Sequence, residues 1–61
     1  MATKKEVLSL VGKNAIHSAF LSFYDNNPRN MYDAMEKAVY SITGLQINTN
    51  TANALLHVVG V

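Results

Sequence analysis

Apolar residues in the middle of the chain recur every three or four positions, at Met31, Met35, Ala38, Val39 and Ile42. This spacing is typical of an amphipathic helix with one buried stripe. Asn27 can cap the helix, Pro28 suits its first position, and Gly44 suits the left-handed residue at its end. The pattern therefore predicts a helix of about four turns between Asn27 and Gly44.

The N-terminal segment carries apolar residues around most of a helical wheel. Thr3 and Glu6 fit a capping box, which predicts one helix that begins near Lys4 and ends before the asparagines at 26–30. One face of this helix would hold Leu8, Gly12, Ala15, Ile16, Ala19, Phe20 and Phe23. The opposite side would hold Leu10, Leu21 and Tyr24. Because one surface helix does not need so much apolar surface, we expect a second copy of the chain to cover part of it.

The last segment is compatible with two structures. Thr49 or Asn50 could cap a short helix that ends at Gly60. Its apolar face would hold Ala52, Leu55, Leu56 and Val59. The alternative is a short β-hairpin, because residues 45–48 alternate between apolar and polar and the C-terminal valines are β-branched. We favour the helix, with the apolar C-terminus docked on this domain or on another copy.

These elements predict one all-α domain over residues 1–61, a helical hairpin closed by a short third helix, with an α+β fold as the alternative. A core of this size is marginal, and the absence of cysteine excludes disulfides and thiolate zinc sites. We therefore expect a homo-oligomer, most simply a two-fold dimer. The residues expected at its interface are Leu10, Gly12, Ala15, Ala19, Leu21 and Val61.

Composition and charge exclude several classes of protein. Apolar residues make up 49% of the chain and charged residues only 15%, which argues against disorder. The formal net charge of +1 gives no strong attraction to nucleic acid or anionic lipid. The apolar runs are too short for a membrane span or a signal-peptide core, so we expect no membrane partner and a cytoplasmic location.

The sequence offers little catalytic chemistry. His17 and His57 are the only imidazoles, and neither has a second ligand at metal-binding spacing. The three glycines are isolated, so no phosphate loop or dinucleotide fingerprint can be built, and there is no nucleophile elbow. We expect a protein that is not an enzyme and that holds no metal and no cofactor.

Tyr40 is the strongest candidate for contact with a partner. It lies on the charged side of the central helix with Asp33, Glu36 and Lys37, where an aromatic ring has no core role. Tyrosine is enriched at protein interfaces. We therefore predict a non-enzymatic interaction protein that binds and modulates another macromolecule. Its size suits accessory regulators or inhibitors of the kind that phages and mobile elements carry.

Two other functions compete with this prediction. A helix-turn-helix-like nucleic-acid binder would use Asn50, Thr51 and Asn53, since asparagine can pair with adenine, but the basic residues are scattered. A small-molecule binder would place its sites between subunits, and it depends on the expected oligomer.

Overall fold

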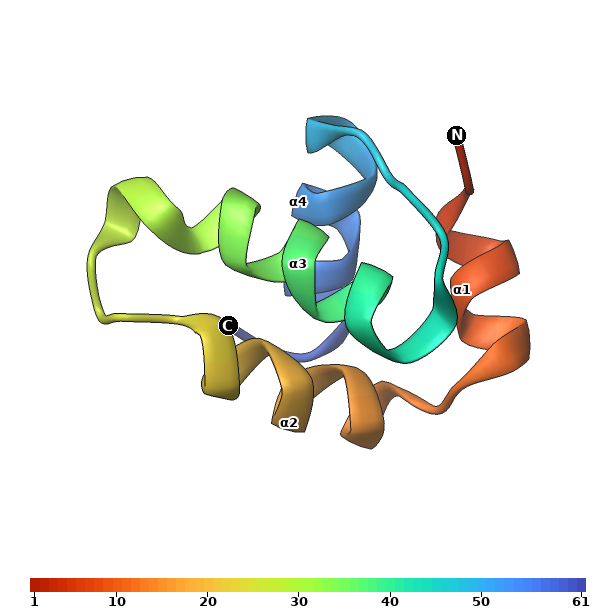
Figure 1. Ribbon diagram of the computed structural model, residues 1–61, viewed down its shortest axis with the longest axis horizontal. Helices are drawn as coiled ribbons and strands as arrows, with labels where there is room; N and C mark the ends of the chain where they lie inside the picture. The colour runs from red at the N-terminus through yellow and green to blue at the C-terminus, as the bar shows by residue number, and fades with distance from the viewer.

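The computed structural model describes residues 1–61 as four α-helices without a strand. They are α1 (Lys4–Leu10), α2 (Lys13–Phe23), α3 (Met31–Thr43) and α4 (Thr49–Val58), and a 3₁₀ turn, η1 (Pro28–Asn30), precedes α3. Figure 1 shows α2 and α3 side by side in opposite directions, with α4 against α3 and α1 at one end. The all-α prediction and its helical hairpin are confirmed, and the α+β alternative is wrong.

The N-terminal segment forms two helices, so the prediction of one helix is wrong. Val11 and Gly12 are extended, with φ of −140° and −73°, and they turn the chain between α1 and α2. The reason lies in packing, because Val7 and Ile16 are both fully buried in the same core. They lie about two and a half helical turns apart in sequence, so a straight helix would point them in opposite directions.

The predicted ends of the central helix are confirmed with one refinement. The Asn27 side chain accepts a hydrogen bond from the Arg29 N–H at 3.1 Å. Pro28 begins the turn η1, which leads directly into α3. At the other end Gly44 has φ 74°, the left-handed conformation that glycine adopts without strain. The capping box of α1 is also present, with the Glu6 N–H donating to Thr3 Oγ1 at 3.1 Å.

The last segment is a helix, but its cap is neither Thr49 nor Asn50. Asn48 Oδ1 accepts a hydrogen bond from the Thr51 N–H at 2.9 Å, so Thr49 and Asn50 lie inside the first turn of α4. Between α3 and α4 residues 45–48 form a non-helical connector, and Ile47 is buried there. The Ala2 N–H donates to the carbonyl oxygen of Gln46 at 2.9 Å and fixes the N-terminus beside this connector.

The core holds twelve buried residues, all of them apolar. They are Ala2, Val7, Ile16, Phe20, Ala34, Met35, Ala38, Val39, Ile47, Ala52, Leu55 and Leu56. Phe20 is the largest of the fully buried side chains, and its ring stacks on Tyr24 with the centroids 5.0 Å apart. Since every helix contributes to this one core, the fold fixes the outer side of α3 relative to α2 and to the connector. None of the four helices is long and apolar enough to cross a membrane.

Candidate functional site

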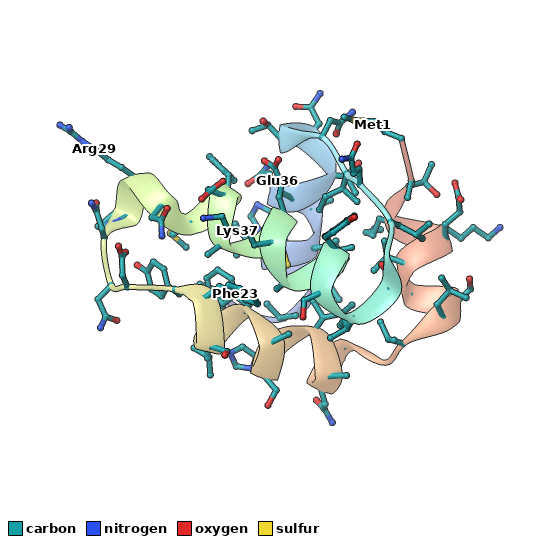
Figure 2. All side chains as sticks on the ribbon, in the orientation of Figure 1. Met1, Phe23, Arg29, Glu36 and Lys37 are labelled. Atoms are coloured by element: carbon teal, nitrogen blue, oxygen red, sulfur yellow. The ribbon has the colours of Figure 1, made fainter.

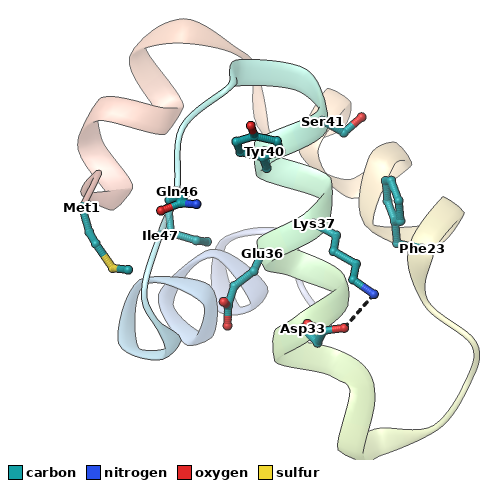
Figure 3. A pocket seen from close by; sticks show the side chains of 9 residues that line it. All are labelled: Met1, Phe23, Asp33, Glu36, Lys37, Tyr40, Ser41, Gln46 and Ile47. Carbon is teal, nitrogen blue, oxygen red and sulfur yellow. Dashed lines mark ion pairs between the residues drawn. The ribbon is translucent and has the colours of Figure 1, made fainter.

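An open groove of about 510 Å³ lies along the outer side of α3. We call it the α3 groove. Its lining comes from α3, the last turn of α2, the connector and the N-terminus: Met1, Phe23, Asp33, Glu36, Lys37, Tyr40, Ser41, Gln46 and Ile47. In the close view of Figure 3, Phe23 lies at one side of α3 and Met1 with Gln46 at the other. The groove therefore joins segments that are far apart in the sequence.

The charged lining of the groove follows from helical spacing. Glu36 and Lys37 follow Asp33 by three and four residues, and Tyr40 follows them by four and three, so the four residues share one side of α3. Figure 2 shows Glu36 and Lys37 on the outside of this helix. Lys37 Nζ lies 3.0 Å from Asp33 Oδ2 in an exposed i,i+4 ion pair, and no second ion pair forms in the chain. Glu36, a partly buried residue, is therefore left without a cationic partner.

Three apolar side chains of the α3 groove remain exposed to solvent. Tyr40 is 57% exposed, Phe23 40% and Met1 81%. Phe23 shares the predicted helix face of Phe20, but only Phe20 is buried in the core. Phe23 is the last residue of α2, and it lies at the rim of the groove.

A second hollow adjoins the α3 groove on the far side of Tyr40. We call it the adjoining hollow, and it shares Met1, Tyr40 and Gln46 with the groove. Its other lining residues are Ala2, Glu6, Gly44 and Leu45. The Ala2–Gln46 hydrogen bond fixes this wall. Tyr40 thus lies between two hollows and can be reached from both.

The structure brings the four predicted partner-binding residues together. Asp33, Glu36, Lys37 and Tyr40 all line the α3 groove. Sequence reasoning missed Met1, Ser41, Gln46 and Ile47 as lining residues, because their places depend on tertiary packing. Only Ser41 carried a local signal, since it follows Lys37 by four residues on the same helix.

The predicted self-association residues do not form one helix face. Gly12 lies in the break between α1 and α2 and caps the helix that carries Ala15 and Ala19. Ala19 packs against the core, whereas Ala15 is exposed. Leu10 and Leu21 are exposed by 61% and 56% on two different helices, and Val61 is 47% exposed at the C-terminus.

The candidate nucleic-acid residues lie at the start of α4. Asn50 and Asn53 are exposed, whereas Thr51 is half-buried and its N–H is taken by the cap at Asn48. The chain has no lysine or arginine after Lys37, so α4 carries no lysine or arginine for phosphate contacts. No specific observation favours this function.

No group of three or more metal-ligating side chains is gathered anywhere in the chain. His17 lies on α2 and His57 on α4.

Comparison with protein-family models, curated proteins and solved structures finds no match to this chain.

Proposed function

We propose that this chain is a non-enzymatic interaction protein of the cytoplasm that binds another macromolecule through the α3 groove and modulates it, as an accessory regulator or inhibitor does. The observation that carries the proposal is Tyr40, a tyrosine 57% exposed between two hollows. Tyrosine contributes large contact area at a small entropic cost, and it is frequent among the residues that dominate binding energy.

The α3 groove has the composition of a protein-binding surface. Exposed apolar side chains lie at its two sides, and charged groups lie between and around them. Tyrosine, phenylalanine and methionine are enriched at protein interfaces, and the groove exposes one of each, at Tyr40, Phe23 and Met1. A small-molecule site instead encloses most of its ligand, and this groove is open to solvent. The geometry therefore supports a macromolecular partner over a small one.

Self-association belongs to the same proposal. Leu10, Leu21 and Val61 leave apolar surface exposed outside the α3 groove. A homo-oligomer, most simply a dimer, would bury part of this surface. Native mass spectrometry of the purified chain counts the subunits. A bare monomer that persists at high concentration would contradict the oligomer and leave the α3 groove unaffected.

A photocrosslinking amino acid at position 40 tests the binding function in the cells that make the protein. Position 32 is the control, because Tyr32 lies on the same helix, is 43% exposed and lies outside the groove. We expect a discrete crosslinked product from position 40 and none from position 32. The purified partner should then lose affinity for the Tyr40→Ala variant and not for Tyr32→Ala. Equal crosslinking, or equal loss of affinity, would contradict a role for the groove.

A further inference from the structure

We infer that the partner presents a basic segment to the α3 groove, with an arginine or lysine placed against Glu36 and Tyr40. This inference rests on the proposed function and names the chemistry of its partner. It follows from the distribution of charge over the surface, from the lack of an ion pair at Glu36, and from Tyr40, which lies one helical turn away from Glu36.

Negative charge is concentrated around Tyr40 although the chain as a whole is slightly basic. Glu6, Asp33 and Glu36 line the α3 groove and the adjoining hollow, and Lys37 is the only basic side chain there. Three carboxylates and one lysine give a side-chain charge of −2, which the α-ammonium group of Met1 in the same lining reduces to −1, whereas the remaining side chains carry +3. Figure 2 shows one of those, Arg29, projecting away from the groove at the far end of α3.

Glu36 is the carboxylate best placed to receive a cation. Asp33 is already paired with Lys37, and Glu6 is hydrogen-bonded to Thr3 in the capping box. Glu36 has neither an ion pair nor a hydrogen bond within the chain, and it is half-buried in the groove wall. Since no cation of the chain pairs with it, Glu36 is the groove carboxylate open to an ion pair with a cation from a partner.

Tyr40 lies one helical turn beyond Glu36 on the same side of α3. The face of a tyrosine ring attracts a guanidinium or ammonium group, and a carboxylate beside it accepts hydrogen bonds from the same cation. An arginine satisfies both groups at once. The apolar neighbours Phe23 and Ile47 in the same groove favour an apolar residue close to that cation. The acidic lining would repel phosphates, which disfavours nucleic acid as the occupant.

A library of random short peptides displayed on phage and panned against the full chain tests the inference. We expect the enriched peptides to carry lysine or arginine next to an apolar residue and to bind more weakly as salt rises. Glu36→Gln, which keeps the size of the side chain, should weaken their binding about tenfold, and Glu36→Lys should weaken it further. Melting curves of both variants verify that the fold is retained.

Asp25→Lys is the matched control for Glu36→Lys. It makes the same change in net charge at an exposed residue outside both hollows. It should leave peptide binding within about twofold of wild type, because distant surface charges are screened. If both reversals weaken binding equally, only overall charge matters and the inference is overturned. Enriched peptides without an excess of basic residues, or no enrichment at all, also overturn it.

The outcomes separate this inference from the proposed function. Peptides that depend on Tyr40 but are not basic would refute the inference and leave the function standing. Peptides whose binding survives Tyr40→Ala would refute both. A random-sequence DNA duplex at low salt is a second probe, and binding that Tyr40→Ala abolishes would overturn the choice of a basic partner. An oligomer of the wild-type chain that Glu36→Lys dissociates would overturn it in favour of a second copy.

Discussion

Gly12→Ser should stabilise the protein, because serine fits the backbone of the α1–α2 break better than glycine does. Gly12 is the N-cap residue of α2, with φ −73° and ψ 160°, a conformation open to every amino acid. A Cβ atom built at this position meets no atom within 4 Å. No side chain caps α2 at present, so the new hydroxyl would gain a free backbone N–H to accept from.

The magnitude has two parts. Replacing a glycine whose conformation any residue can adopt stabilises the folded protein by about 0.4–1 kcal/mol, because it reduces the conformational entropy of the unfolded chain. A serine cap adds a few tenths of a kcal/mol over a glycine cap. The sum is about 0.5–1.5 kcal/mol, which raises the Tm of a domain of this size by roughly 3–10 °C.

The same substitution at Gly44 should have the opposite sign. A Cβ at Gly44 also meets no atom within 4 Å, so space does not distinguish the two sites. The difference is φ, which is 74° at Gly44 and places a side chain in the left-handed region. That conformation costs an L-residue about 1–2 kcal/mol, which exceeds the gain from the unfolded chain. Gly44→Ser should therefore lower stability by about 0.5–1.5 kcal/mol.

Urea unfolding followed by circular dichroism measures both variants. The expected result is a higher midpoint for Gly12→Ser and a lower midpoint for Gly44→Ser, with unchanged slopes. A loss of stability in Gly12→Ser would show that Gly12 does not adopt the extended conformation described above. It would then refute the account of the break between α1 and α2.

Three further substitutions test the core, a cap and the surface. Phe20→Ala should lower the free energy of unfolding by about 3–5 kcal/mol, which is comparable with the whole stability expected of a chain this short. The cooperative thermal transition should therefore be lost. A retained transition near the wild-type Tm would contradict the burial of Phe20. Asn48→Ala should cost about 1 kcal/mol in urea unfolding, because it removes the acceptor of the Thr51 N–H, whereas an unchanged midpoint would argue against this cap. Lys37→Met should change stability by less than about 0.5 kcal/mol, because the ion pair of Lys37 with Asp33 is exposed. A larger coupling energy in a double-mutant cycle with Asp33→Asn would contradict this weak contribution.

The central helix could be predicted because its signals are local. Its apolar stripe repeats at helical spacing, and its ends carry residues whose own side chains or conformations stop a helix. The break at Gly12 could not be predicted in this way. Glycine disfavours a helix interior by only about 1 kcal/mol, so its presence does not fix a break. The break brings Val7 and Ile16 into the same core.

The candidate site also has one part that local spacing predicts and one part that depends on tertiary packing. Asp33, Glu36, Lys37 and Tyr40 share one side of a single helix, so helical spacing was enough to group them. The opposite wall comes from other segments, and Phe23 follows the apolar stripe of α2 as closely as the buried Phe20 does. Tertiary packing distinguishes these two rings, because the assembled fold buries Phe20 fully and leaves Phe23 40% exposed.

The hydrogen bond from Ala2 to Gln46 determines how the protein should be handled at the bench. It holds the first residue so that Met1 lies at the border of the α3 groove and the adjoining hollow. Any affinity tag fused before Met1 would emerge beside Tyr40 and compete with whatever binds there. A tag fused after Val61, which is exposed and lines neither hollow, leaves both accessible. Interaction screens that use an N-terminal fusion would therefore miss a partner that binds as proposed in the α3 groove.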